Sequence, residues 1–262
     1  MSIERDGFLS PDLTDWVAGH RKANASWFAF LYKLNRFAQG RLLAVTVDGG
    51  DEQGRLIAAL YARGLTNIQS AILLLERGSL SGCLILARSC FEDVFYIGAV
   101  RSSPTYHKNL HQRDEIAKSK LARVLLSPEG KAPRLSAEDQ ERLNRFRKSL
   151  LRTSRQKKSV SIEKVAQDAG LSGLYKIYRG LSNDPAHPSI TALERHLDWQ
   201  QNKFCWGPEH GKPDIFNIIC LVLWHLVRQY DDQFGNVGNQ SSSELERQYD
   251  ELLESTNLGP PL

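Results

Sequence analysis

The stretch from Ser79 to Arg101 constrains the fold of this chain more than any other. Its apolar side chains spread around most of a helix, which predicts a helix buried on nearly all sides. Arg88 and Glu92 interrupt this pattern, and a spacing of four residues places them one turn apart on one face, where they can pair. The apolar positions that carry the prediction are Leu84, Ile85, Leu86, Phe91, Val94, Phe95 and Ile97.

The charges of Arg88 and Glu92 admit two interpretations. Replacing a buried ion pair by apolar residues is often neutral or stabilising, so such a pair is a weak source of stability. Buried charges with perturbed pKa values are also frequent at functional sites. The pair is therefore either a structural feature of the core or part of a site, and the sequence leaves both interpretations open.

A second long helical pattern precedes this stretch, from Asp51 to Arg77. Gly78 predicts its C-terminal end, and Ser79 or Ser81 predicts the start of the next helix. Because the connection is so short, the two helices should pack as an antiparallel hairpin. The predicted fold is all-α, a multi-helix bundle of roughly eight or nine helices built on this central antiparallel helical hairpin.

The 262 residues are enough for one large domain with a sizeable core. We expect residues 1–48 to form N-terminal helices that pack on a helical core domain of residues 49–235. Residues 236–262 are predicted to be a flexible linker followed by a C-terminal helix and tail. Within the core domain, Pro104 predicts the start of another helix, and Thr191 with Glu194 resembles a capping box.

Positive charge is concentrated in one segment. The net charge of +4 is too small to indicate a nucleic-acid-binding protein, but residues 131–159 hold ten basic and three acidic side chains. This segment either holds a nucleic-acid backbone or is a solvated helix face. The candidate nucleic-acid-binding residues are Arg142, Arg145, Arg147, Lys148 and Arg152.

Several classes of site lack support in the sequence. His107 and His111 have a metal-ligand spacing but no HExxH glutamate and no CxxC partner, so we expect no metal site. P-loop, GxGxxG and GxSxG motifs are absent, and we expect no cofactor. The amino terminus has no secretory apolar region, and no apolar run reaches the ~20 residues of a membrane span, which predicts a soluble cytoplasmic protein.

The segment from Tyr178 to Leu197 contains the strongest candidate chemistry. His187 lies between two prolines, and its pKa near neutrality suits an acid or base. If His187 lies against Arg88 or Glu92, then Arg179, Ser182 and His187 complete a set with a base, an orienting carboxylate and cations for a phosphate. Alternatively, these residues only bond to helix ends and hold the loop on the bundle.

Two motifs carry a resemblance to a known family. Arg88-Ser89-Cys90-Phe91-Glu92 forms an RSxxE-like helix, and Leu181-Ser182 followed by His187 forms an LSxxxH-like loop. Both occur, in this order, in a large prokaryotic family of helical proteins of unknown function, which the chain resembles from Asp51 to Leu197. This resemblance implies a fold more than an activity.

Arg179 and His187 also resemble the Arg-then-His motif of HEPN domains, although more residues separate them here. Many HEPN proteins are metal-independent ribonucleases of toxin–antitoxin and antiphage systems. The resemblance implies an RNA substrate, a homodimer and a partner protein of a defence or toxin–antitoxin system. It also implies that His187 accepts the 2′-hydroxyl proton while Arg88 and Arg179 stabilise the phosphorane. The alternative is a non-enzymatic scaffold or sensor in which the Arg-Glu-His network is structural.

Overall fold

The structure is a computed structural model that describes residues 2–103, 105–126, 136–154, 160–183, 189–235, 242–256 and 258. Within these residues the chain forms twelve α-helices, one short 3-10 helix and a two-stranded sheet of four residues. The predicted all-α fold is confirmed. The structure has more helices than the eight or nine that the sequence indicated, in part because α1 (Ile3–Asp6) and α10 (Ile190–Glu194) are too short to give a periodic pattern of apolar residues.

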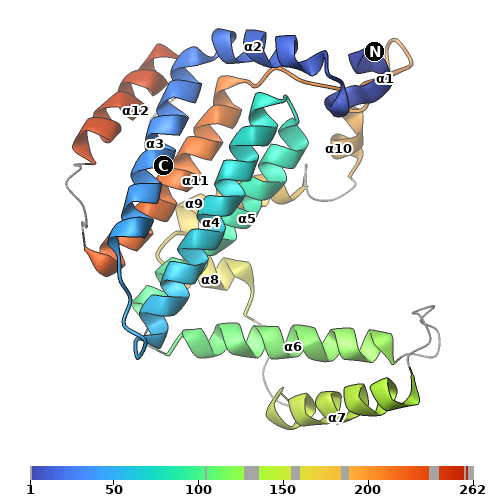
Figure 1. The fold of residues 1–262 in the computed structure, drawn as a ribbon, viewed down its shortest axis with the longest axis vertical. Helices are drawn as coiled ribbons and strands as arrows, with labels where there is room; N and C mark the ends of the chain where they lie inside the picture. The colour runs from blue at the N-terminus through green and yellow to red at the C-terminus, as the bar shows by residue number, and fades with distance from the viewer. Residues whose placement is uncertain are drawn as a thin grey trace.

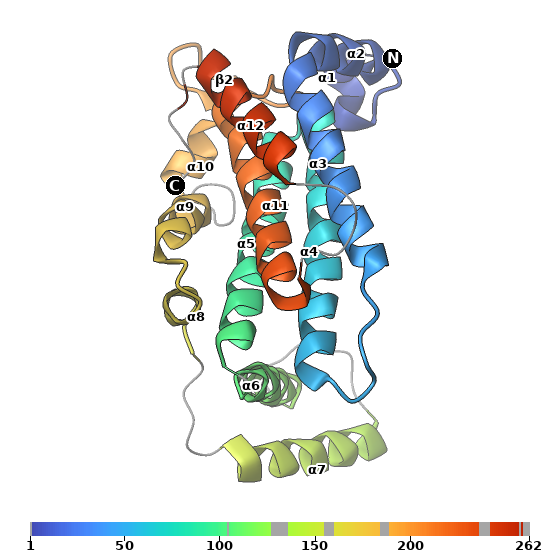
Figure 2. The same cartoon turned by 90° about the vertical axis from the view of Figure 1, so that its left-hand side faces the viewer.

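The centre of the bundle is the predicted antiparallel hairpin of α4 (Glu52–Glu76) and α5 (Leu80–Ser102). Helix α11 (Pro213–Phe234) packs against both of them, and α3 (Ala25–Ala44) covers α4 and α11. Helix α12 (Ser243–Ser255) lies on the outer side of α3 (Figures 1 and 2). Most positions of α5 are buried, so the helix with the least amphipathic sequence is the one that its neighbours surround.

Local signals set the two ends of α4. The side chain of Asp51 accepts a hydrogen bond from the amide of Gly54 at 2.8 Å and caps the first turn. At the other end Gly78 has φ +72°, and the amides of Gly78 and Ser79 donate to the carbonyls of Leu75 and Leu74. This glycine-terminated end reverses the chain within three residues and directs α5 back along α4.

Helices α8 (Ile162–Asp168) and α9 (Ser172–Asn183) cover another face of α5. The hydroxyl of Ser161 caps α8 by accepting a hydrogen bond from the amide of Lys164. Helix α9 buries Leu174, Tyr178 and Leu181 on one side. This side places α9 against the middle of α5.

Helices α6 (His107–Leu125) and α7 (Ala137–Ser154) pack on each other and extend away from the bundle as an arm (Figures 1 and 2). Pro104, the predicted start of this helix, lies outside the described residues, and α6 begins at His107. The ring nitrogens Nε2 of His107 and His111 lie 3.6 and 3.4 Å from the carboxylate of Glu52, which places the base of the arm beside the start of α4.

The turn between α4 and α5 is covered by α1, by α2 (Leu13–Ala23) and by the segment that follows α10. This segment contains β1 (Leu197–Asp198) and β2 (Lys203–Phe204), which pair antiparallel. Helix α10 starts one residue after Ser189, whose hydroxyl accepts from the amide of Ala192. The predicted cap at Thr191 is therefore wrong.

The structure was also searched for membrane-spanning helices and for clusters of metal-ligating side chains. Among the described residues, every helix is too short or too polar to cross a membrane. The same residues hold no group of three or more His, Cys, Asp or Glu side chains suited to a metal ion.

Candidate functional site

The structure brings Arg88, Glu92 and Ser182 together between α5 and α9. Nη1 of Arg88 lies 3.2 Å from Oε1 of Glu92, which confirms the predicted pair. Nε of Arg88 donates to the hydroxyl of Ser182 at 2.9 Å, although 94 positions separate the two residues. The two sequence motifs therefore meet in space.

Tyr178 completes this cluster, and the sequence did not single it out. Its hydroxyl accepts from Nη2 of Arg88 at 2.6 Å and donates to Oε1 of Glu92 at 2.9 Å. The guanidinium carbon of Arg88 lies 4.6 Å from the centre of the tyrosine ring, a cation–π distance. The spacing of four residues between Tyr178 and Ser182 was the available signal, because it places both side chains on one face of α9.

Burial, followed by the charge of Glu92, raises the pKa of Tyr178 to about 12. The phenol therefore keeps its proton at neutral pH and remains a donor to Glu92. Ser182 in turn donates to the carbonyl oxygen of Tyr178 at 2.9 Å. Arg88, Glu92, Tyr178 and Ser182 form one connected network, which we call the Arg88 network.

The Arg88 network reaches the protein surface. The side chains of Arg88 and Glu92 are 23% and 20% exposed. Arginine carries five N–H donors, and contacts with the described residues account for three of them on Arg88. The remaining donors give the guanidinium the capacity to bind an anion while the protein holds its position.

A second polar cluster lies on the neighbouring face of α5. The buried carboxylate of Asp93 accepts from Nη1 of Arg63 at 2.8 Å, and Nη2 of Arg63 donates to Ser89 at 3.1 Å. Asn67 lies next to both acceptors. This cluster was not predicted from the sequence, although Arg63 with Asn67 and Ser89 with Asp93 both have the i, i+4 spacing that puts two side chains on one helix face.

Asp93 is predicted to make the stability of the protein depend on pH. Burial raises its pKa from 3.8 to about 7, and the nearby charge of Arg63 opposes this shift. Between these pH values the folded chain holds a proton that the unfolded chain has released. The free energy of unfolding should therefore fall as the pH rises from about 4 to about 7.

The variant Asp93→Asn should lose this part of the pH dependence, which urea unfolding at a series of pH values measures. Asp114→Asn is the matched control, since Asp114 is an exposed carboxylate on α6. If Asp93→Asn and the wild type showed parallel pH profiles, the raised pKa of Asp93 would be disproved.

The other candidate residues whose side chains are described lie outside the Arg88 network. Arg179 is exposed and lines a separate cavity of about 470 Å³ with Tyr175 and Lys176. His187 lies outside the described residues. Arg142, Arg145 and Lys148 are exposed on α7, Arg147 is half-buried, and the side chain of Arg152 lies outside the described part.

The arm that carries these basic residues joins the bundle at the C-terminal end of α5 (Figure 1). Arg88 lies 14 residues before Ser102, or about 21 Å along the helix axis. The basic helix and the Arg88 network are therefore separate features, which only an extended ligand can contact together.

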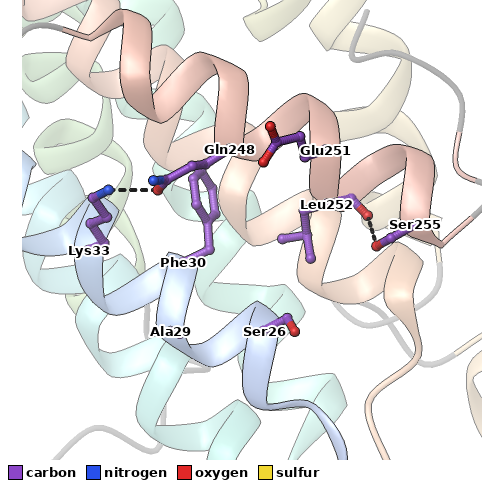
Figure 3. A pocket seen from close by; sticks show the side chains of 8 residues that line it. All are labelled: Ser26, Ala29, Phe30, Lys33, Gln248, Glu251, Leu252 and Ser255. Atoms are coloured by element: carbon purple, nitrogen blue, oxygen red, sulfur yellow. Dashed lines mark hydrogen bonds between the residues drawn. The ribbon is translucent and has the colours of Figure 1, made fainter.

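A groove between α3 and α12 has the character of a packing contact. It holds about 340 Å³ and is lined by Phe30 and Leu252 together with small and polar side chains (Figure 3). Nζ of Lys33 donates to Oε1 of Gln248 across it at 2.7 Å. These contacts dock α12 on α3, and the groove brings together none of the candidate residues.

Comparison with known proteins identifies the family. A family model described as a family of unknown function, DUF5677, matches residues 54–204. No curated protein and no solved structure matches the chain. The matched range contains both polar clusters of α5 and confirms the predicted resemblance to a family of unknown function. Because the match covers more than half of the sequence, the chain belongs to the DUF5677 family.

Proposed function

We propose that this protein is a HEPN-like, metal-independent endoribonuclease with Arg88 and Glu92 at its reaction centre. The observation that supports this proposal is the geometry of the Arg88 network. A guanidinium is held by three side chains, remains partly exposed, and contacts Ser182, five positions before His187 in the sequence. A fixed cation close to solvent is suited to the charge that develops on a phosphorus centre under attack.

In the proposed reaction the 2′-hydroxyl oxygen of RNA attacks the adjacent phosphorus, and the bond from this phosphorus to the 5′-oxygen of the next nucleotide breaks. The products are a 2′,3′-cyclic phosphate and a 5′-hydroxyl end. His187 accepts the 2′-hydroxyl proton as general base and returns a proton to the departing 5′-oxygen. Arg88 donates its remaining N–H groups to the phosphorane oxygens, while Glu92 and Tyr178 hold the guanidinium in place. Arg179 lies outside the network, so we assign it to the RNA backbone instead of the phosphorane.

The same proposal assigns the arm to substrate binding. Arg142, Arg145 and Lys148 present positive charge on α7, and Phe146 beside them is partly exposed. Lysine and arginine side chains on one face bind a phosphate backbone, and an aromatic ring adds base stacking. An RNA bound along this face would extend from the arm toward the middle of α5.

The HEPN resemblance adds the biological setting of the proposal. HEPN-like sites are composite across a two-fold interface, so we propose a homodimer. We also propose a cytoplasmic toxin or antiphage effector with a partner protein from the same defence system.

Cleavage of RNA tests this function directly. Arg88→Ala should lower the cleavage rate by about 10²–10³-fold, as loss of one transition-state donor does. His187→Ala should lower the rate by about 10²–10⁴-fold, as loss of a general base does. EDTA should leave cleavage unchanged.

Arg36→Ala removes an exposed arginine of α3 and serves as the control. Growth arrest on expression is the second measurement, and it should follow the cleavage rates. If Arg88→Ala and His187→Ala folded well and matched the wild type in both measurements, the proposal would be wrong.

One observation favours the alternative of a non-enzymatic scaffold. Tyr178 and Ser182 each accept a hydrogen bond from Arg88 and donate one to another group, so the network satisfies both of these hydroxyl groups. Such a network also serves to fix α9 on α5. In that case Arg88→Ala would lower stability, and the wild type would neither cleave RNA nor arrest growth.

A further inference from the structure

A cavity of about 590 Å³ lies at the start of α5, between α1 and the segment that follows α10. This volume is typical of sites that hold a small molecule or one unit of a polymer. Figure 1 shows α1, α10 and the start of α5 at the same end of the bundle. The cavity is therefore distinct from the Arg88 network, from the arm and from the groove of Figure 3.

Aromatic side chains form one wall of this cavity. Phe204 and Trp206 line it, and both are largely exposed. Their rings bury little apolar surface, so packing of the protein does not explain their presence. Exposed aromatic rings beside a cavity are the surfaces on which unpaired nucleic-acid bases stack.

Charged side chains of both signs line the same cavity. Arg195 and His196 are suited to a phosphate oxygen. Glu4 and Glu209 are carboxylates that can accept hydrogen bonds from the exocyclic amine of cytosine or adenine. The combination of aromatic face, carboxylate and cation matches a nucleotide, which presents a base, an amine edge and a phosphate.

The cavity and the Arg88 network share one face of α5. Ser81 lines the cavity and lies seven residues before Arg88, which is close to two helical turns. The two side chains therefore lie on one stripe of the helix, about 10 Å apart along its axis. Ile85 lies between them and is exposed.

We propose that this cavity binds one unpaired base of the RNA whose phosphate contacts Arg88. The proposal rests on the ribonuclease function above and adds a base site to it. Trp206 and Phe204 stack on the base, Glu4 or Glu209 accepts from its exocyclic amine, and Arg195 contacts the neighbouring phosphate. The site should therefore prefer cytosine and adenine over uracil, which has no exocyclic amine.

The test is a binding titration with short 2′-O-methylated oligocytidylate, which keeps the base and cannot undergo attack by a 2′-hydroxyl. Trp206→Ala should raise the Kd about tenfold, as expected for loss of one stacking partner. Trp199→Ala is the matched control, because Trp199 is 66% exposed, Trp206 is 65% exposed, and only Trp206 lines the cavity. Oligouridylate should bind the wild type more weakly than oligocytidylate.

The outcomes separate the two proposals. Equal Kd values for Trp206→Ala, Trp199→Ala and the wild type would overturn the base site, and RNA cleavage by the wild type would then leave the ribonuclease proposal intact. Binding that depends on Trp206, without any cleavage of unmodified RNA, would support the base site and overturn the ribonuclease. Absence of binding by the wild type would overturn the base site as well.

Discussion

Replacing Gly78 with alanine should lower the free energy of unfolding by about 3 kcal/mol. Gly78 has φ +72°, where a side chain costs about 1 kcal/mol or more. An added Cβ would also lie 2.7 Å from the amide nitrogen of Glu209 and 2.5 Å from the ring of Trp16. Because backbone atoms cannot move aside as a side chain can, this overlap adds about 1–3 kcal/mol.

Gly170→Ala is the matched control for this effect. Gly170 has the same φ of +72°, but an added Cβ would meet no atom within 4 Å. Its loss of stability should therefore be limited to about 1 kcal/mol of backbone strain. Urea unfolding of both variants measures the difference, and equal losses would show that the close approach of Glu209 is unimportant.

The contact at Gly78 also connects stability to the proposed base site. The amide of Glu209 donates to the carbonyl of Gly78 at 3.0 Å, which holds the segment around β2 against the turn between α4 and α5. Trp206 and Glu209 both line the cavity on this segment. Gly78→Ala is therefore expected to raise the Kd for oligocytidylate as well.

The helical hairpin could be predicted because its signals are local. Apolar side chains recur on a helical period through α4 and α5, and burial of a face requires that period. Gly78 marks the turn by a conformation that other residues rarely adopt. The β1–β2 pair and α1 have only a few residues each, so no periodic pattern could indicate them.

The partners of Arg88 show that contacts between different helices could not all be predicted from the sequence. Periodicity identifies neighbours on one helix, such as Glu92, but it does not show which helix lies opposite. The motif therefore indicated Ser182, while Tyr178 was recognised only from the structure. Arg179 shows how much one position matters, because a shift of one residue rotates a side chain by about 100° around a helix. Tyr178 is buried against α5, whereas Arg179 is exposed.

Among substitutions of charged residues, Arg41→Ala should cause the largest loss in the free energy of unfolding. Its side chain is 2% exposed, and Nε lies 3.2 Å from Oδ2 of Asp231 on α11. The guanidinium carbon also lies 4.4 Å from the ring centre of Phe37. Arg41→Ala leaves the half-buried Asp231 without this cation, and breaking such a pair costs about 3–5 kcal/mol. Because Asp231 retains some exposure, we expect Arg41→Ala to lower the free energy of unfolding by about 3 kcal/mol, which urea unfolding measures.

The adjacent pair of Arg101 and Asp232 provides the control. Nη1 of Arg101 lies 2.9 Å from Oδ2 of Asp232, but both side chains are substantially exposed. Asp232→Ala should therefore cost less than about 1 kcal/mol. The double variant Arg41→Met/Asp231→Leu should recover most of the stability lost in Arg41→Ala, because an apolar pair removes both buried charges. If Arg41→Ala lowered the free energy of unfolding by less than about 1 kcal/mol, the expected cost of breaking this buried pair would be contradicted. If the double variant did not recover the lost stability, other contacts of Arg41 would contribute more to stability than the ion pair.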